Sequence, residues 1–518
     1  MFYKNINAKK KVKKMTLNFT RFEKAMNTEV DDALMPYKTA KLSYNFNVKN
    51  GSLRSGYGFK ALTLPGNLYE TPRVIVPPTG VIKKLWFYKY YSQTLGRYNN
   101  QIIIYLDGGD IYTCNIVSDS VLCGKIIDTV FSSGVPNALN YRLNSLDTMI
   151  FSSETDGMWT YTQNQVVQRV LDAPHIKSMC LHYERLFAVV GGERNRLAFS
   201  ANLDPTDWGE SMSSGGFIDM QDERGALSRV ISYNDYVYVF RDYGVSRVSA
   251  YGEQSQFSVS HLFTSSVKLY GDTVTLCGNK VLLLARDGIH VFDGYATRKL
   301  NLGIDELFNG VDNDNACGLY YNNKFYLACI LNFNDNTQVG CETYVGGYKN
   351  NALIELDLST NELLITRGVD ISSMLALDDG KISKLVASFN GEHSGKIGEL
   401  TKDGKVFGTP LKKMWLSPKS SMGYPGQIKH IEECVVKTNT DCNMIISTDK
   451  QSRVVNLPGG SVAKRIKINV FGEQMQVGFM INENTDKDIE ITCPQIVVAV
   501  TDRWWWTKNY LNSFLEDK

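Results

Sequence analysis

The chain shows an alternation of apolar and polar residues that short polar turns interrupt at a nearly constant interval. In residues 227–300, two successive segments each contain an apolar run, a polar turn, a β-branched run, a glycine turn and a further run. Alternation with a period of two, bounded by Asn, Asp and Gly, predicts β-hairpins. The turn residues Asp235 and Asn279 lie 44 positions apart, and so do Gly244 and Gly288 in the second turns.

The same interval extends beyond these two segments. Asn323 follows Asn279 by another 44 positions, and Asp147 precedes Asp235 by 88, which is two such steps. A four-stranded unit that recurs about every 40–50 residues, the length of one blade, is the sequence signature of a β-propeller. We therefore predict an all-β chain with a β-propeller of six to eight blades over residues 71–411. The alternative is an all-β protein whose irregular hairpins share turn chemistry by chance.

The pattern changes near residue 412. Residues 412–500 hold strands that alternate cleanly between apolar and polar positions and are separated by polar loops. This pattern is typical of an antiparallel sandwich with one solvated face. We predict a C-terminal β-sandwich over residues 412–500 and a Trp-rich C-terminal tail over 501–518. Residues 1–70 are expected to form a basic arm and an extended segment that precede the propeller.

Composition narrows the class of protein. The 518 residues are 43% hydrophobic and 11% aromatic, which excludes global disorder. With 56 basic and 54 acidic residues the net charge is +2, so the whole-chain charge predicts no affinity for nucleic acid or membranes. Ten scattered cysteines, without a C-x-x-C pair, indicate free thiols in a reducing compartment. No apolar run has the length of a membrane span and no apolar signal core begins the chain, so we expect folding in a cytoplasm.

The sequence contains no recognisable catalytic or metal-binding pattern. The six histidines form no H-x-x-x-H or H-E-x-x-H pair, and His290 is expected to be a surface or satisfied strand residue. Residues 391–397 resemble a phosphate loop but are one residue short and lack the Ser or Thr that holds magnesium. Residues 312–315 resemble a calcium loop without its closing Glu. We predict that the protein is not an enzyme and uses no cofactor or metal.

Two aromatic motifs are candidate interfaces. Three consecutive indoles, Trp504, Trp505 and Trp506, cannot all face one side of a strand, so at least one is expected to be exposed or to contact a partner. Sealing of the core is the alternative. Asp207 and Trp208 end the motif DPTDW, in which Pro and Asp favour a turn and the Trp can fill a blade interface. A ligand or partner contact is the other interpretation of that motif.

Charged segments give two further expectations. Residues 1–14 carry six lysines and no acid. From this run we take Lys9, Lys10, Lys11, Lys13 and Lys14 as candidate contacts to DNA phosphates, with a solvated arm as the alternative. The polar loop at residues 219–224 is expected to form a solvated or inter-subunit rim.

Several motifs together resemble a known family. DPTDW at residues 204–208 is followed by the acidic strand GFIDM, by a hairpin that ends in YGVSRV, and by DGIHVFDG; an N-x-x-x-G-x-L-x-x-G stretch begins earlier at Asn47. This order resembles tailed-bacteriophage proteins of the tail-nozzle and packaged-DNA-stabilisation, or head-tail connector, kind. The resemblance covers residues 195–310, and the chain departs from it at residues 332–350 and in its lysine-rich start.

The resemblance implies a structural virion protein that is made in the host cytoplasm and located in the phage tail. The partners that it implies are further copies of the chain in a ring, expected to be a hexamer, portal, adaptor or other tail proteins, tail fibres, and double-stranded DNA that passes without sequence specificity. A propeller-based carbohydrate-binding or carbohydrate-degrading receptor-recognition protein is the alternative, because propeller faces host sugar sites. That alternative lacks paired carboxylates in a readable motif. A cytoplasmic scaffold propeller is a third hypothesis.

Overall fold

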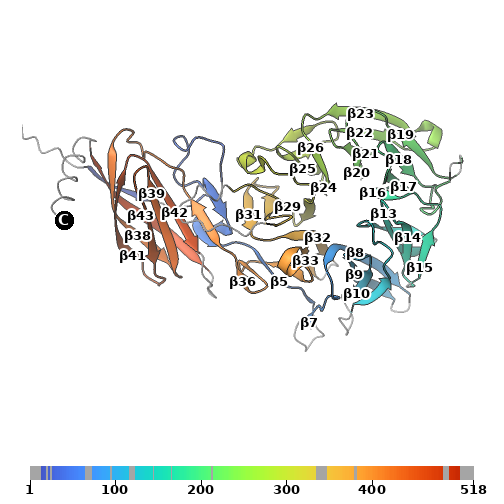
Figure 1. The fold of residues 1–518 in the computed structure, drawn as a ribbon, viewed down its shortest axis with the longest axis horizontal. Coiled ribbons are helices and arrows are strands. Elements are labelled where there is room, and N and C mark those ends of the chain that lie inside the picture. Colours follow the sequence, from blue (N-terminus) through green and yellow to red (C-terminus); the bar gives the residue numbers. More distant parts are fainter. Residues whose placement is uncertain are drawn as a thin grey trace, which may run out of the picture.

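The computed structural model describes residues 13–501, with gaps at 19–21, 24–25, 65–72, 94–95, 116–122, 144, 165, 210, 212–213, 334–346, 379–381 and 482–488. The described residues form an all-β protein in two parts, a ring of sheets and a sandwich beside it (Figure 1). The only helices in these ranges are short 3-10 turns, η1 (Gln254–Gln256), η2 (Asp305–Phe308) and η4 (Gly391–His393).

Seven sheets follow one another along the described chain and make up the ring. The first three are blade 1, β8 (Ile82–Ser92), β9 (Arg97–Leu106), β10 (Ile111–Asn115) and β11 (Gly124–Ile127); blade 2, β12 (Asn137–Leu143), β13 (Leu146–Ser153), β14 (Gly157–Thr162) and β15 (Val167–Val170); and blade 3, β16 (Ile176–His182), β17 (Arg185–Val190), β18 (Arg196–Phe199) and β19 (Gly216–Asp219).

The next three sheets repeat the pattern. They are blade 4, β20 (Leu227–Tyr233), β21 (Tyr236–Arg241), β22 (Gly244–Ser249) and β23 (Ser258–Thr264); blade 5, β24 (Leu269–Cys277), β25 (Lys280–Ala285), β26 (Gly288–Phe292) and β27 (Thr297–Lys299); and blade 6, β28 (Cys317–Tyr321), β29 (Lys324–Cys329), β30 (Ala352–Asp357) and β31 (Leu363–Arg367). Within each blade the strands pair in chain order. The first strands of neighbouring blades contact one another, and β32 of the seventh sheet contacts β8, so the ring is closed.

This architecture is a β-propeller, as the repeat interval predicts. Asn234 with Asp235, and Asn322 with Asn323, all have positive φ. Positive φ at both central residues is the geometry of two-residue hairpin turns, which is why Asn and Asp recur there. Asp147 differs from this prediction because it lies inside β13, two residues after Ser145, which has the positive φ of that turn.

The seventh blade draws on both sides of the propeller sequence. Strands β32 (Ile371–Asp378), β33 (Ser383–Phe389) and β34 (Ile397–Thr401) are completed by β5 (Gly58–Ala61), which pairs antiparallel with β34. The sheet continues through β35 (Lys405–Val406) and β36 (Thr409–Pro410), while β6 (Thr63–Leu64) and β7 (Arg73–Val74) form a small ladder. A strand from before residue 70 therefore closes the ring, where the sequence pattern placed only an extended segment.

The sandwich also draws on both ends of the chain. One sheet has the order β3-β4-β43-β38-β41, with β1 also paired to β43; its strands are β1 (Lys13–Asn18), β3 (Phe46–Lys49), β4 (Ser52–Ser55), β38 (Ile428–Thr438), β41 (Lys464–Gly472) and β43 (Glu490–Thr501). The other has the order β2-β37-β42-β39-β40, with β2 (Leu42–Tyr44), β37 (Lys413–Leu416), β39 (Cys442–Thr448), β40 (Ser452–Leu457) and β42 (Met475–Ile481). The sandwich thus includes residues before as well as after the propeller.

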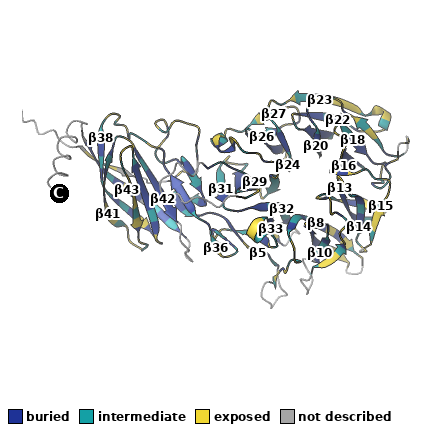
Figure 2. Ribbon diagram, in the orientation of Figure 1, coloured by how far each residue is buried: buried dark blue, intermediate teal, exposed yellow. Residues whose placement is uncertain are grey.

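Burial follows from this arrangement. In each blade the middle strands are largely buried, whereas outer strands such as β15 and β23 face solvent (Figure 2). The largest core cluster runs from the sandwich into blades 5 and 6, and includes Ile431 and Phe479 together with Leu282 and Leu356. Phe22 lies in the same cluster and meets Trp415 edge-on, with ring centroids 4.9 Å apart. The two parts of the molecule therefore share one apolar core.

Candidate functional site

The lysines and tryptophans that the sequence singled out lie at the ends of the chain. Lys9, Lys10 and Lys11, and Trp504, Trp505 and Trp506, lie outside the described residues. Lys13 and Lys14 are the first two residues of β1, at one end of the sandwich. The Lys14 ammonium is exposed and lies 2.9 Å from the carboxylate of Glu432. The Lys14 ammonium therefore forms an ion pair with Glu432 and remains accessible to solvent.

Asp207 and Trp208 occupy the loop between β18 and β19. The Trp208 side chain is buried, packs among residues of blades 2 and 3, and donates its indole N–H to the Pro205 carbonyl at 2.9 Å. Asp207 accepts a hydrogen bond from the Gly209 backbone at 3.0 Å. Asp204 caps the turn by accepting from both the backbone and the hydroxyl of Thr206. The motif thus folds a loop onto a blade interface and keeps its indole inside the chain.

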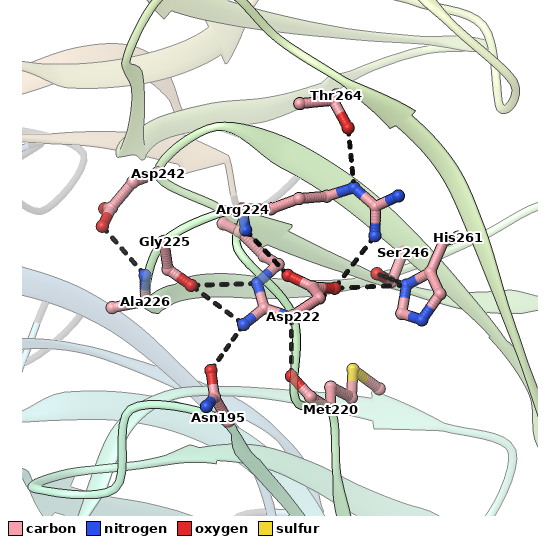
Figure 3. A network of polar contacts seen from close by, with 11 residues as sticks. Asn195, Met220, Asp222, Arg224, Gly225, Ala226, Asp242, Ser246, His261 and Thr264 are labelled. Carbon is pink, nitrogen blue, oxygen red and sulfur yellow. Dashed lines mark hydrogen bonds and ion pairs between the residues drawn. The ribbon is translucent and has the colours of Figure 1, made fainter.

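In the loop expected to form a polar rim, Asp219 and Glu223 are exposed, whereas Asp222 and Arg224 join an ionic network around a buried arginine between blades 3 and 4 (Figure 3). Arg241, at the end of β21, is fully buried. Its guanidinium donates to the carbonyls of Met220 at 2.8 Å and Gly225 at 2.9 and 3.0 Å, and to the side-chain oxygen of Asn195. One of its nitrogens also lies 2.9 Å from the Asp222 carboxylate.

Asp222 is the acid at the centre of this network. Its carboxylate accepts from the backbone and guanidinium of Arg224, each at 2.9 Å, and lies 3.4 Å from the imidazole of His261. Burial alone would raise the pKa of Asp222, but the Arg224 backbone N–H and the charges of Arg241 and Arg224 outweigh it and lower the pKa. The network holds one carboxylate between two guanidinium groups and connects the blade 3–4 linker to the strands of blade 4. Asp219, the last residue of β19, pairs with Arg196 at the surface.

A second histidine–aspartate pair lies in blade 5. His290 Nε2 lies 2.9 Å from Asp287 Oδ1, and the His290 side chain is almost fully buried in β26. Lys299 lies close to Asp287 and also pairs with Asp305. Within the described ranges no group of three or more His, Cys, Asp or Glu side chains is arranged to hold a metal ion. The pair is therefore part of the ionic packing of blade 5.

A groove lies at the junction of the propeller and the N-terminal segment. This junction groove has a volume of about 950 Å³, and its apolar lining includes Phe22, Val30, Leu34, Val48, Leu302 and Leu363. The side chain of Leu34 is 79% exposed. Sequence reasoning did not find the groove because its walls come from residues 22–51, 301–303 and 360–363, and the first of these segments is at least 250 residues from the other two along the chain.

Backbone hydrogen bonds and one ion pair fix the N-terminal segment that lines the groove. The Phe22 N–H donates to the Gly51 carbonyl at 2.9 Å, and the Thr28 N–H donates to the Gly303 carbonyl at 2.7 Å. Lys41 pairs with Asp32 at 3.0 Å and so fixes the base of the loop that carries Leu34. These bonds attach the N-terminal segment to the sandwich on one side and to the propeller on the other.

Exposed tyrosines gather on the hairpin turns of blades 3 to 5. The rings of Tyr183 and Tyr251 meet edge-on at 5.7 Å. The Arg247 guanidinium lies 4.4 Å from the centre of the Tyr236 ring and 5.6 Å from that of Tyr295. Such surfaces of tyrosine and arginine are frequent in protein and carbohydrate interfaces.

Comparisons with known proteins address the fold. No family model and no curated protein matches this chain. Among solved structures, Raptor from Chaetomium thermophilum has a TM-score of 0.44 and 9% identity over 63% of this chain, which spans only 28% of Raptor. BBS1N, solved in complex with ARL6DN, has a TM-score of 0.40 and 9% identity over 66% of this chain and 97% of that chain. The RRP9 WD40 repeats have a TM-score of 0.36 and 9% identity over 66% and 99%.

At this identity the likeness concerns the fold alone, and the β-propeller assignment follows from the strand order of the seven sheets. The described part of the chain contains no helix with the length and apolarity that a membrane span requires.

Proposed function

We propose that this chain is a structural virion protein of a tailed phage, a ring-forming subunit of the tail nozzle or head-to-tail connector. The observation that carries the proposal is the run of motifs in residues 195–310. In the propeller, DPTDW lies in the β18–β19 loop, GFIDM contains β19, YGVSRV covers β22 except for its last residue, and DGIHVFDG contains β26 with the start of the turn after it. The four propeller motifs thus fall in blades 3, 4 and 5, which follow one another around the ring, and the stretch that begins at Asn47 falls in β3 and β4 of the sandwich.

The arrangement of the molecule supports a role as a building block. The sandwich is assembled from strands at both ends of the chain, and one apolar core continues from it into the propeller. Such a junction suits a subunit that must stay rigid within an assembly, because the propeller and the sandwich cannot move relative to each other without exposing apolar surface. A ring of such subunits requires a heterologous interface that closes on itself.

Electron microscopy and native mass spectrometry of the purified chain test this proposal. We expect closed rings, with six subunits as the expected number, and we expect antibodies against the chain to label the tail region of the phage particle that contains it. A strictly monomeric chain at high protein concentration, together with particles that lack it, would overturn the proposal.

The second candidate is a carbohydrate-binding receptor-recognition protein, and the exposed tyrosines of blades 3 to 5 favour it. Aromatic rings such as Tyr251, which is 75% exposed, can stack on sugar rings. A glycan array probed with the wild-type chain and with Tyr251→Ala distinguishes the two candidates. Glycan binding that the substitution abolishes supports this second function, and the absence of any glycan ligand leaves the structural role.

A further inference from the structure

We propose that the junction groove receives the tryptophan triplet, Trp504, Trp505 and Trp506, of a second copy of this chain. This inference deepens the proposed ring-forming function, on which it rests, by naming the two surfaces that meet between neighbouring subunits. The argument uses the chemistry of the groove, the reach of the chain beyond β43, and the charges on both sides.

The groove has the size and lining of an aromatic-binding site. Its volume of about 950 Å³ is at the upper end of the range of roughly 300–1,000 Å³ for pockets that bury drug-sized ligands. Its lining is mostly apolar, and Leu34 and Val30 leave 79% and 37% of their side-chain surface exposed. Apolar side chains of this exposure beside a preformed hollow are typical of a docking surface. More than one indole fits in a space of this size.

The triplet cannot reach the groove of its own subunit. Leu53 of β4 pairs with Ile491 of β43, and the two strands are antiparallel. Gly51, which lines the groove, precedes Leu53 by two residues and therefore lies level with residue 493 of β43. The edge of the groove is therefore level with a position eight residues before Thr501, or about 26 Å away along the strand. Trp506 is five residues beyond Thr501, which corresponds to at most about 17 Å of extended chain. A triplet that docks at this edge of the groove therefore comes from another copy of the chain.

The charges on the two sides are complementary. Both charged residues among the described groove-lining residues are acids, Glu23 and Glu362. The triplet is flanked by the cations Arg503 and Lys508, and with Asp502 the segment of residues 502–508 has a net charge of +1. A cation that approaches an acid at the rim, around an aromatic anchor in the centre, is the usual organisation of a protein interface. Because groove and triplet are different surfaces, the contact is heterologous and can close a ring.

The main test uses three full-length variants and measures mass in solution by light scattering. Leu34→Asp places a charge in the groove, and the tail variant carries Trp504→Ala, Trp505→Ala and Trp506→Ala. Leu171→Asp is the matched control, because Leu171 is also 79% exposed but lies between blades 2 and 3, away from the groove. We expect the control to form rings as wild type does. The groove and tail variants should each fail to form rings, with apparent association weakened by about tenfold or more.

Mixing the groove variant with the tail variant gives a sharper result. Each pair of unlike chains retains one intact groove and one intact triplet, so we expect a heterodimer and no larger species. Rings that persist in either single variant, or a mixture that stays monomeric, would overturn the inference. Because Leu34 is mostly exposed, its replacement should leave the thermal unfolding midpoint unchanged, which confirms that the variant is folded.

A peptide experiment separates this inference from the proposed function. A labelled peptide of residues 501–510 is titrated into the tail variant and followed by fluorescence anisotropy. We expect binding that the Leu34→Asp substitution weakens by about tenfold or more, and no binding of a peptide with alanine at the three Trp positions. If wild-type chain forms no ring but the peptide binds the groove, the ring is wrong and the docking contact stands. If rings form but the peptide does not bind, the docking contact is wrong and the ring stands.

Discussion

Several charged side chains lie inside this protein, and each is held by a specific set of partners. Arg241 makes its contacts with three carbonyl or amide groups and one carboxylate, as described above. In the sandwich, the Lys429 ammonium donates to the backbone carbonyls of Tyr424, Gln427 and Glu473 at 2.7, 3.0 and 2.7 Å. A buried charge that loses its partners is costly, whereas a surface pair contributes little.

The first prediction concerns Arg241. Replacing it by Ala removes one of two guanidinium groups from the partly buried Asp222 carboxylate and removes the donor to the carbonyls of Met220 and Gly225. We expect the free energy of unfolding to fall by about 3–5 kcal/mol in urea titrations. Arg196→Ala, which breaks the half-exposed pair with Asp219, is the control and should cost no more than about 1 kcal/mol. Equal losses in the two variants would show that Arg241 is not the centre of a buried network.

The second prediction is a pH dependence at Lys413. Burial lowers the pKa of this lysine from 10.5 to about 8, and its ammonium donates to the Leu411 carbonyl at 3.0 Å. Between pH 8 and 10.5 the unfolded chain holds a proton that the folded chain has released, so this group makes the folded state more stable as pH rises. Below pH 8 the buried charge costs up to about 3 kcal/mol.

Lys413→Met removes that cost. We expect the variant to exceed wild type in the free energy of unfolding at pH 7, and the difference to shrink as pH rises from 8 towards 10.5. Urea titrations of both proteins at several pH values measure this difference in the free energy of unfolding. Tyrosines and cysteines that ionise in the same pH range contribute equally to both proteins, so their effect cancels in the difference. A difference that does not change with pH would contradict the pKa direction.

At the scale of elements, the pairing of β5 with β34 completes blade 7 and so closes the propeller ring. Lys60 of β5 lies 3.1 Å from the Glu399 carboxylate of β34, and Lys384 of β33 also pairs with Glu399. The Thr63 backbone N–H donates to the same carboxylate at 3.2 Å. One acid therefore connects the strand that arrives from the sandwich with two strands of the last blade.

The third prediction concerns Gly58, the first residue of β5. A Cβ at Gly58 would lie 2.1 Å from the backbone oxygen of Lys405, so even Ala must displace β5 or β35. We expect Gly58→Ala to accelerate hydrogen exchange in β5 and β34 and to lower the unfolding midpoint. Gly124→Ala, in the outer strand of blade 1 where a Cβ meets open space, is the control and should leave exchange in its own blade unchanged. Unaltered exchange in Gly58→Ala would mean that β5 does not close the ring.

At the scale of the whole molecule, both ends of the described chain meet in the sandwich. The chain begins in β1 to β4, enters the propeller through β5, passes through seven blades, and returns through β37 to β43 (Figure 1). Lys13 of β1 pairs with Val500 of β43, so the two ends leave the same end of one sheet. The propeller is therefore a closed insertion between the strands of the sandwich, and a ring assembled from such subunits would carry both terminal segments at one place.

The sequence by itself determined the local geometry of this protein. Asn234, Asp235, Asn322 and Asn323 predict hairpin turns because Asn and Asp tolerate positive φ. Alternation does not predict burial in the strands that follow, because β21 and β29 are buried on both faces. The interval of 44 positions then predicts a propeller. These features depend on neighbours within about one blade, which is the range over which a sequence pattern carries information.

Only the tertiary structure decided what depends on distant segments. The pairing of β5 with β34 joins residues more than 330 positions apart, and Arg54 of β4 pairs with Glu490 across an even longer separation. The ion network at Arg241 and the junction groove likewise arise where separate segments converge. No periodicity marks such contacts, because the complementary surfaces come together only when the chain has closed on itself.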